Sequence, residues 1–500
     1  MENLTDCLNE KLKPYCLDNT QFWLAYSGGL DSRVLLQAVW EYFRSCAANG
    51  NLRTSLNAIH INHGLQSQAD DWQAHCQLTC DDLGVPLTMV ALHLDPNASN
   101  VEALAREGRY RAFESVMTES SVLLMAHHLD DQAETFLYRL MRGSGTQGLA
   151  GIPEKRALGS GELLRPLLSI TRADLEHYAR HKQLQWIEDP SNTNQDFDRN
   201  FIRHQVLPLL QTRWPRASQQ IAKSSGFCRT AENHIRILAE QDWQTLDCAL
   251  EKVGFSVSLA ALNRLEHKLA CLRYGFQALH VTLPNESQWY EILNQVIADD
   301  ARDDSQALVR WGDGFCAGKF RGRMHVFIDS TPSGSVSTDS SSINVSSINT
   351  SQYALTLKPS SQTQRCAFSE MQRCTLPWAP DWLLEVHAGG NLRVDSDVIT
   401  VRPRVGGERS QPASRRHSQK LKKVLQESAI QPWLRAILPL VYSDEALIAV
   451  ADYWVEKPYH TDDLNQGVRL RLVNQHPWQL QLEQALVKPS AIERIAKTRR

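Results

Sequence analysis

Short apolar runs alternate with segments of helical apolar spacing over the first 142 residues. The apolar runs are residues 22–26, 56–61, 87–92 and 122–126. The helical segments begin at residue 33 and cover residues 68–83, 101–117 and 130–142. Strands that alternate with helices form right-handed βαβ units and build a parallel sheet, whose ligands bind beyond the carboxyl ends of the strands. We therefore predict an α/β domain with its site in the loops that follow these runs.

The loop after the first run reads Ser-Gly-Gly-Leu-Asp-Ser. Its glycines let a ligand approach the main chain, and the helix that follows presents unpaired N–H groups to an anion. No Lys follows the glycines, so the loop differs from G-x-x-x-x-G-K-[ST]. Asp31 would repel phosphates unless Mg²⁺ lay between them. A magnesium nucleotide is expected, with an ordinary strand-to-helix turn as the alternative; the nucleotide-binding candidates are Ser27, Gly28, Gly29, Leu30, Asp31 and Ser32.

A second polar cluster, at residues 127–135, follows the fourth run and reads His-His-Leu-Asp-Asp-Gln-Ala-Glu-Thr. At least one carboxylate is expected to hold Mg²⁺, and the predicted metal ligands are Asp31 and Asp131. His127 or His128 is expected to orient a phosphate or to move a proton, and the pattern does not choose between them. Two alternatives are an aspartate that only caps the helix and a zinc site.

Length and composition limit the remaining possibilities. Five hundred residues predict two to four domains. A net charge of −3 excludes a uniformly basic nucleic-acid binder, although a local patch remains compatible with it. No apolar stretch is long enough to cross a bilayer, no secretory signal is evident, and the eleven cysteines are scattered, so we expect reduced thiols and a cytoplasmic protein without a membrane partner.

The chain changes character along its length. We predict a catalytic domain over residues 1–215 and a mainly helical substrate-binding domain over residues 216–330. In the second of these we expect helices over residues 231–247 and 259–279 and short strands near residues 307–327. Residues 331–352 are rich in Ser and Thr and predict a flexible linker. Residues 353–500 form the last predicted domain, in which residues 402–435 carry nine basic residues against two acidic ones. This segment predicts contacts to polyanion phosphates, with a solvated charged face as the alternative.

Several motifs in one order resemble a known family. The Ser27–Ser32 loop resembles the pyrophosphate (PP) loop of the N-type ATP pyrophosphatases. The cluster at residues 127–135 narrows the resemblance to the tRNA(Ile)-lysidine synthetase family, together with motifs at residues 63–65, 102–110, 165–168, 188–192 and 199–203. Residues 415–427, which read R-R-x-S-x-K-L-K-K-x-x-Q-E, resemble the C-terminal tRNA-binding module of that family.

The resemblance implies a fold and a reaction. The fold is a parallel-sheet, adenine-nucleotide α-hydrolase-like domain, followed by a small helical domain and an α+β domain. The reaction uses ATP and Mg²⁺ to join L-lysine to C2 of the wobble cytidine, position 34, of tRNA(Ile) with anticodon CAU. It passes through an adenylated tRNA and yields lysidine, AMP and pyrophosphate. The alternatives are another PP-loop ligase or thiolase acting on tRNA, and a non-catalytic RNA-binding protein; a homodimer is left open.

The resemblance also suggests roles for single residues. Arg106 shares a helix face with Arg109 and is suited to a phosphate or a carboxylate, unless it is only an ion-paired surface residue. His60 ends the second strand, where the fold would place the adenosine; a solvated strand end is the alternative. The predicted catalytic residues are Asp31, Asp130, Asp131, Arg106 and His127. The predicted tRNA-binding residues are Arg199, Arg203, Arg415, Arg416, Lys420, Lys422 and Lys423.

Overall fold

The computed structural model describes eleven stretches of the chain. They are residues 2–16, 19–48, 54–64, 68–92, 101–188, 198–298, 308–329, 353–356, 371–395, 398–465 and 467–487. The chain forms two compact units, Met1–Ile235 and Arg236–Arg500, and helix α10 (Ala217–Thr245) runs through the division between them. The predicted domain boundary at residue 215 stays a prediction, and the predicted linker at residues 331–352 lies outside the described residues.

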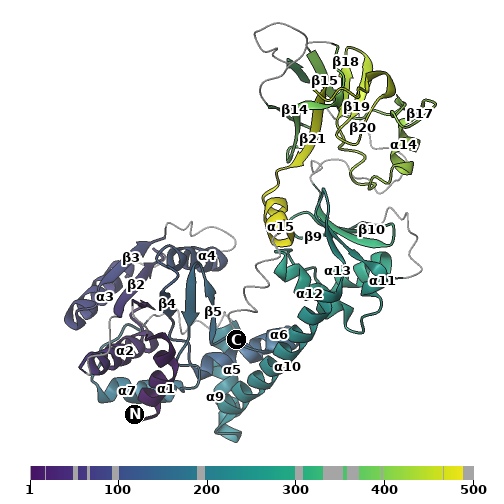
Figure 1. Cartoon of the computed structure of the whole chain (residues 1–500). Helices are drawn as coiled ribbons and strands as arrows, with labels where there is room; N and C mark the ends of the chain where they lie inside the picture. Colours follow the sequence, from purple (N-terminus) through teal and green to yellow (C-terminus); the bar gives the residue numbers. More distant parts are fainter. Residues whose placement is uncertain are drawn as a thin grey trace. The chain divides into compact units, whose positions relative to one another are not determined.

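A six-stranded sheet of order β3-β2-β1-β4-β6-β5 forms the centre of the first unit (Figure 1). The neighbouring pairs from β3 to β6 are parallel, and β5 lies antiparallel at the edge. The strands are β1 (Gln21–Ala25), β2 (Ser55–Asn62), β3 (Leu87–Ala91), β4 (Ser121–Leu124), β5 (Lys155–Leu158) and β6 (Gly161–Leu164). The predicted parallel α/β fold is confirmed, and the strand order reverses direction between β1 and β4.

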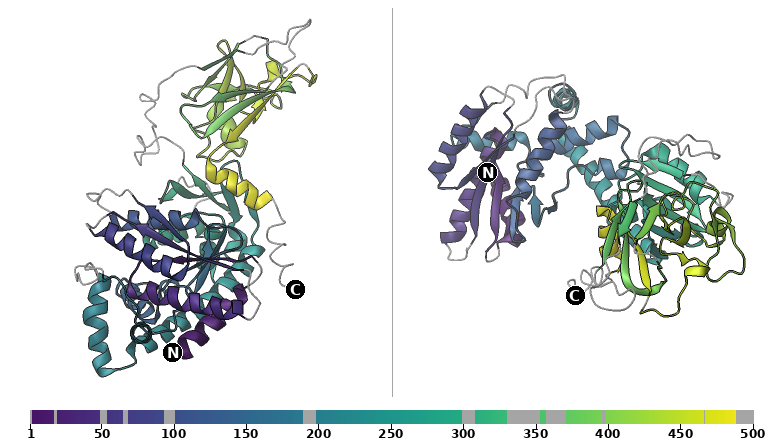
Figure 2. Two further views of the ribbon diagram at one scale, coloured as in Figure 1. Left: turned by 90° about the vertical axis from the view of Figure 1, so that its left-hand side faces the viewer. Right: turned by 90° about the horizontal axis from the view of Figure 1, so that it is seen from above.

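Helices cover both faces of this sheet (Figures 1 and 2). Helices α1 (Glu2–Leu12), α2 (Leu30–Ala48), α3 (Ala69–Leu83) and α7 (Arg172–His181) pack on one face, and α4 (Val101–Glu114) packs on the other. The remaining helices before α10 are α5 (Leu129–Met141), α6 (Thr146–Leu149), α8 (Asp198–Phe201) and α9 (Leu207–Arg213). A 3-10 turn, η1 (Lys13–Tyr15), follows α1, and a π-helical turn, η3 (Ile202–Val206), joins α8 to α9.

Side-chain alternation assigns each face of the sheet its own core. Phe22 and Leu24 of β1 pack in a cluster with residues of α1, α2, α3 and α7. Trp23 lies between them in sequence and packs instead with Ile59 of β2 and Phe113 of α4. Because successive strand residues point to opposite faces, a strand buried on both sides is apolar at nearly every position. This explains why the central strands β1 and β4 are almost entirely apolar, whereas the exposed edge strand β5 begins with Lys155 and Arg156.

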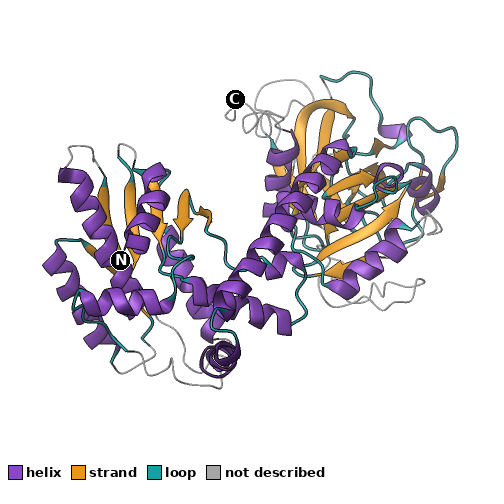
Figure 3. Cartoon of the chain, turned by 90° about the horizontal axis from the view of Figure 1, so that it is seen from below, coloured by secondary structure: helices purple, strands orange, loops and turns teal. Residues whose placement is uncertain are grey.

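The second unit begins with helices and a five-stranded antiparallel sheet (Figure 3). The predicted short strands near residues 307–327 are present. The structure also has a hairpin, β7 and β8, that we did not predict, and it divides the segment 259–279 between two helices. The elements are β7 (Cys248–Leu250), β8 (Phe255–Ser258), α11 (Leu259–Leu262), α12 (Lys268–Ala278), α13 (Glu286–Glu291), π-helical η4 (Ile292–Ile297), β9 (Leu308–Trp311), β10 (Phe315–Phe320) and β11 (Arg323–Ile328).

The rest of the second unit is rich in antiparallel strands. Its elements are β12 (Tyr353–Thr356), β13 (Gln372–Thr375), β14 (Trp382–Leu392), β15 (Val398–Arg402), β16 (Arg409–Ser410), β17 (Gln419–Lys420), α14 (Leu421–Glu427), β18 (Leu440–Ser443), β19 (Ala446–Val450), β20 (Trp454–Val455), η6 (Lys457–Tyr459), β21 (Val468–Asn474) and α15 (Pro477–Val487). One hydrophobic cluster joins these strands to Val253, Cys316 and Phe327, and the ring of Phe327 stacks on Trp433 at 4.6 Å. In the part of the chain that the structure describes, no helix has the length and apolar character needed to cross a membrane.

Candidate active site

The loop between β1 and α2 has a backbone that only glycine adopts easily. Gly28 has a φ of +82°, and the N–H of Ile187 donates to its carbonyl at 2.9 Å. A Cβ atom on Gly28 would lie 2.6 Å from Cδ1 of Ile187 and 2.9 Å from Sγ of Cys76. Both the left-handed backbone and the close packing therefore require glycine at this position. Cys76 and Cys80 lie four residues apart on α3, and both are buried.

Hydroxyl groups and an imidazole hold this loop in place. The hydroxyls of Ser27 and Ser32 lie 3.0 Å apart, and Ser32 Oγ donates to the carbonyl of Gly29 at 3.0 Å. His60 of β2 is buried, and its Nδ1 lies 2.9 Å from the carbonyl of Tyr26, the residue before the loop. A carbonyl only accepts, so Nδ1 carries the proton and Nε2 is free to accept. His60 is therefore not a solvated strand end.

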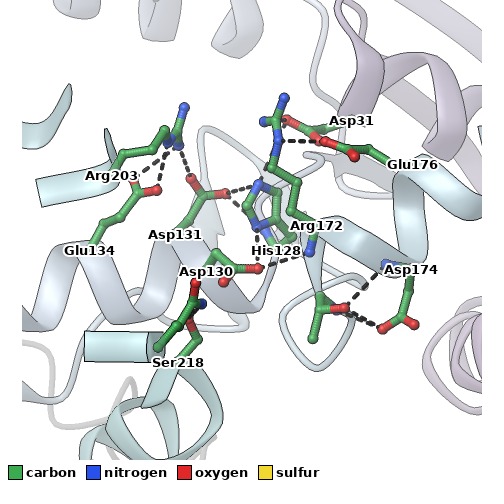
Figure 4. Close-up of polar contacts among 12 residues, drawn as sticks. Asp31, His128, Asp130, Asp131, Glu134, Arg172, Asp174, Glu176, Arg203 and Ser218 are labelled. Atoms are coloured by element: carbon green, nitrogen blue, oxygen red, sulfur yellow. Dashed lines mark hydrogen bonds and ion pairs between the residues drawn. The ribbon is translucent and has the colours of Figure 1, made fainter. Parts of the chain in front are cut away.

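An imidazole lies between the carboxylates that follow β1 and β4 (Figure 4). Nε2 of His128 is 3.7 Å from Oδ2 of Asp31 and 3.5 Å from Oδ2 of Asp131, and Nδ1 is 3.8 Å from Oδ2 of Asp130. His128 is completely buried, and neither ring nitrogen has a hydrogen-bond partner among the residues that the structure describes. This cluster lies where the strand order reverses, which is the usual ligand position of an open α/β sheet.

Two of these carboxylates also accept backbone N–H groups at the N-termini of helices. Asp131 accepts the backbone N–H of His128 at 2.9 Å, and Asp130 accepts the backbone N–H of Arg172 at 2.8 Å, where α7 begins. Both aspartates therefore cap a helix, which was the alternative role considered for them. For Asp131 this role is combined with close approach to His128, so capping does not account for the whole cluster.

Two arginines place positive charge against the carboxylates (Figure 4). Arg203 donates from Nε to Oε1 of Glu134 at 2.6 Å and from Nη2 to Oδ1 of Asp131 at 3.1 Å. Nη1 of Arg172 lies 3.6 Å from Oδ2 of Asp31. These contacts bring residues from α7 and from the turn after α8 to the first turns of α2 and α5.

The carboxylates differ in how readily they take up a proton. Burial raises the pKa of Asp31 above its usual value, although His128 and Arg172 oppose this shift. Burial also raises the pKa of Glu134. Asp131 is the opposite case, because His128, His127 and Arg203 outweigh burial and hold its pKa below the usual value. Asp131 is therefore the carboxylate that stays charged most firmly.

The side chains fit a magnesium ion that also binds phosphate. Oδ1 of Asp31 is buried and has no hydrogen-bond partner, so it is an oxygen donor without a ligand. Among the residues that the structure describes, no group of three or more His, Cys, Asp or Glu side chains could hold a metal ion by itself. Mg²⁺ commonly takes one or two carboxylates and completes its shell with phosphate oxygens and water. Asp31 and Asp131 remain the predicted ligands.

His127 faces a basic group of side chains instead. Nε of Arg165 donates to Nδ1 of His127 at 3.2 Å, so the neutral ring carries its proton on Nε2. Burial lowers the pKa of His127 to about 4, which keeps the ring neutral near pH 7. Arg106 is exposed on α4, and its guanidinium carbon lies 5.2 Å from the ring centre of Tyr110.

Comparison with known proteins extends the likeness over nearly the whole chain. Residues 2–210 match the PP-loop domain family, and residues 399–472 match the TilS substrate C-terminal domain family. A tRNA(Ile)-lysidine synthase of Coxiella burnetii is 36% identical over 444 residues, which are 87% of this chain and 90% of that protein. A tRNA(Ile)-lysidine synthase of Photorhabdus laumondii is 33% identical over 485 residues, which are 95% of this chain and 99% of that protein. The chain belongs to the tRNA(Ile)-lysidine synthase family. One similar solved structure is that of the U34-tRNA thiolase NcsA from Methanococcus maripaludis with its [4Fe-4S] cluster. The aligned region covers 45% of this chain and 77% of the thiolase chain, with 19% sequence identity and a TM-score of 0.38.

In this lysidine synthase family member, the fold brings Asp31, Asp130 and Asp131 together around His128. The sequence pattern did not distinguish the roles of the two histidines, and His127 was the one named as a predicted catalytic residue; the structure places His128 among the carboxylates. The sequence also did not single out Arg172. Arg172 follows a helix-capping Thr-x-x-Asp pattern, a signal that is common to ordinary helices. No local pattern links residue 172 to residue 31, because only the folded chain places them side by side.

Two arginines predicted to bind tRNA lie beside the carboxylates in this family member. Arg199 donates to the hydroxyl of Thr135 at 2.9 Å, and Arg203 is paired with Glu134 and Asp131. Both guanidinium groups thus already donate hydrogen bonds to side chains of α5. Their contact with tRNA stays a prediction.

Ion pairs reduce the free charge of the basic segment in the TilS substrate C-terminal domain. Arg402, Arg404, Arg415 and Lys423 are paired with Glu445, Glu408, Glu427 and Glu427, respectively. Arg416, Lys420 and Lys422 are exposed and form no ion pair with the described residues. The buried Glu456 accepts from Ser410 Oγ and the Gln411 N–H, which fixes the β16–β17 hairpin. Arg416 and Lys420 lie on this hairpin, and Lys422 lies on α14, which follows it.

Proposed function

We propose that this chain is an ATP-dependent ligase that joins L-lysine to C2 of the wobble cytidine of tRNA(Ile) with anticodon CAU. The products are lysidine, AMP and pyrophosphate. Its membership of the lysidine synthase family supports this reaction. The structural observation that carries the proposal is the buried imidazole of His128 between Asp31 and Asp131 at the point where the strand order reverses.

The first step would adenylate the tRNA. Cytosine O2 attacks the α-phosphate of ATP, and pyrophosphate leaves. The Ser27–Ser32 loop and the start of α2 present backbone N–H groups to the phosphates, and they are held in place before ATP arrives. Asp31 and Asp131 would hold Mg²⁺, which when bound neutralises charge on the phosphates.

The second step would place the lysine ε-amine against the adenylated base, so that the amine displaces AMP. The amine must lose a proton, because its pKa in solution is about 10.4. Glu134 is buried and accepts from Arg203 through both of its oxygens, which leaves Asp130 and Asp131 as the carboxylates that can receive an ammonium group. Asp131, whose pKa is low, would attract the cation, and Asp130 beside it would accept the proton.

The deciding experiment incubates the full chain with ATP, Mg²⁺, labelled lysine and a tRNA(Ile) transcript carrying CAU. Label should enter this tRNA and should not enter a methionine tRNA with the same anticodon. If ATP is split to AMP and pyrophosphate while no label reaches the tRNA, the chain is a different ligase. A requirement for a sulfur donor would instead indicate a thiolase, and absence of ATP-pyrophosphate exchange would indicate a non-catalytic binding protein.

A further inference from the structure

We propose that Arg106, Arg109, Arg156 and Arg165, grouped around Tyr110, form an anion subsite for a backbone phosphodiester of the tRNA. We call these four residues the arginine cluster. The proposal rests on the proposed function, because it takes tRNA as the substrate, and it adds a contact site separate from the Ser27–Ser32 loop and from the basic C-terminal segment.

Stacking and hydrogen bonds assemble the cluster from distant parts of the sequence. The guanidinium carbons of Arg106 and Arg156 lie 5.2 Å and 4.7 Å from the ring centre of Tyr110. Arg165, at the end of β6, is buried, donates to His127 and bonds the carbonyl of Pro153 at 2.7 Å. Arginines from helix α4 and from the β5–β6 hairpin therefore lie beside the same aromatic ring, that of Tyr110.

The cluster has no counter-ion of its own. None of its four arginines forms an ion pair with a carboxylate among the described residues, and Nε of the half-buried Arg109 has no hydrogen-bond partner. Burial lowers the pKa of both Arg109 and Arg165, and Arg106, Arg156 and Arg165 together outweigh burial and lower the pKa of Tyr110. Cations held together and partly out of water are costly unless a ligand brings negative charge.

The charge balance favours a phosphodiester over the phosphates of ATP. Phosphates bound at the Ser27–Ser32 loop meet Asp31, so they need a metal ion between them and the protein. The arginine cluster contains no carboxylate and suits an anion that arrives without a metal, such as the singly charged linkage of a nucleic acid. Arg156 lies on β5, the edge strand of the sheet, and is exposed, so a long polymer can reach it.

The link from Arg165 to His127 connects this subsite to the reaction centre. His127 directly precedes His128, the imidazole between Asp31 and Asp131. A phosphodiester held by the cluster would therefore fix the nucleotide next to it in the chain close to the carboxylates. The cluster thus positions the reacting cytidine rather than taking part in bond making.

The test compares Arg156→Ala with Arg111→Ala in the full chain. Arg111 is an exposed arginine of α4, paired with Glu107, and its loss removes the same charge. Arg156→Ala should weaken tRNA binding about tenfold and flatten the plot of log affinity against log salt by about 0.7. The KM for ATP should stay unchanged, and Arg111→Ala should match the wild type in both measurements.

Two outcomes would overturn the subsite. One is a raised KM for ATP with unchanged tRNA affinity, which would assign the cluster to the nucleotide. The other is an identical salt slope for Arg156→Ala, Arg111→Ala and the wild type. A second variant, Tyr110→Leu, removes the ring on which Arg106 and Arg156 stack and should also weaken tRNA binding. Binding is measured without lysine, so this test does not depend on the ligation reaction. If the wild type binds tRNA through Arg156 but makes no lysidine, the proposed function is refuted while the subsite is supported.

Discussion

Asp31 and Asp131 share one imidazole neighbour but respond to it differently. Asp31 keeps a raised pKa because burial dominates there, whereas Asp131 gains enough positive charge from its neighbours to have a lowered pKa. The position of Arg203, which bonds Asp131 but not Asp31, accounts for part of this difference. Two chemically identical side chains thus have pKa values shifted in opposite directions, because the fold places different groups beside them.

Replacing Asp31 by Asn should abolish magnesium-dependent release of pyrophosphate while leaving tRNA binding intact. The amide keeps the shape of the side chain but loses the charge that a metal ion needs. Pyrophosphate release and tRNA affinity are measured on the same preparation. Asp71→Asn, an exposed change in the first turn of α3, is the matched control and should behave as the wild type. Normal activity in Asp31→Asn would remove this residue from the site.

The stability contributed by His127 should depend on pH. Its pKa is about 4 in the folded chain and about 6.5 when unfolded, so between these values the unfolded chain binds more protons. Folding stability therefore rises from pH 4 to pH 6.5 and falls as the solution is acidified. Between pH 7 and pH 4.5 this residue should account for a loss of about 2 kcal/mol. Urea unfolding of His127→Gln at both pH values should show a smaller difference than the wild type, and equal differences would contradict the assignment.

At the scale of single elements, the turn between β1 and α2 offers a sharp test. Gly28→Ala would place a Cβ against Ile187 and Cys76 at a positive φ, which should cost about 1–3 kcal/mol in the free energy of unfolding. Gly29→Ala is the matched control, because its nearest neighbour would be Oγ of Ser27 at 3.6 Å, an ordinary contact. Urea or thermal unfolding compares the two variants. Equal stabilities would show that the loop relaxes around the added methyl group.

The sequence predicted β1 to β4 and α2 to α5 closely, and β1 to β4 each end within two residues of the expected position, whereas α1, β5, β6 and α6 to α9 were not predicted. Runs buried on both faces are apolar throughout, and this pattern is easily recognised. The second unit was less predictable. The hairpin of β7 and β8 is made of strands of three and four residues, too short for a periodic signal, and it pairs with β11, far along the chain.

The same distinction holds for the candidate site. Asp31, His127, Asp130 and Asp131 lie in two local motifs, so the sequence alone is enough to name them as candidates. The contacts of Arg172 and Arg203 with these carboxylates join residues 42 to 141 positions apart, so no local spacing encodes them. The choice of His128 over His127 as the neighbour of the carboxylates likewise needed the geometry of the turn after β4.

At the scale of the whole molecule, the core of the second unit decides how the tRNA-binding region should be tested. A truncation after residue 350 would remove most of the cluster that covers Val253, Cys316 and Phe327. Such a protein would expose apolar surface, and its weaker tRNA binding would not report on charge alone. Substitutions of single exposed residues on the β16–β17 hairpin and on α14 leave this core intact.

The triple change of Arg416, Lys420 and Lys422 to Ala should weaken tRNA binding by at least tenfold and flatten its salt dependence by about 2 to 3 units of slope. All three side chains are exposed, so thermal stability should be unchanged. A triple change of Arg236, Arg264 and Arg273 removes the same charge from other exposed positions and is the control. If the two triple variants have equal salt slopes, the weaker tRNA binding follows from the lower net charge and not from these three positions.

Helix α10 belongs to both units, since the division between them falls at Ile235 inside its 29 residues. Its backbone hydrogen bonds therefore continue across the division without a break. If one unit loses its packing, that half of α10 must fray, and the ladder of the other half then ends in unsatisfied groups. Helix α10 is therefore expected to melt as one element, and loss of order in either half should lower the hydrogen-exchange protection of the other half.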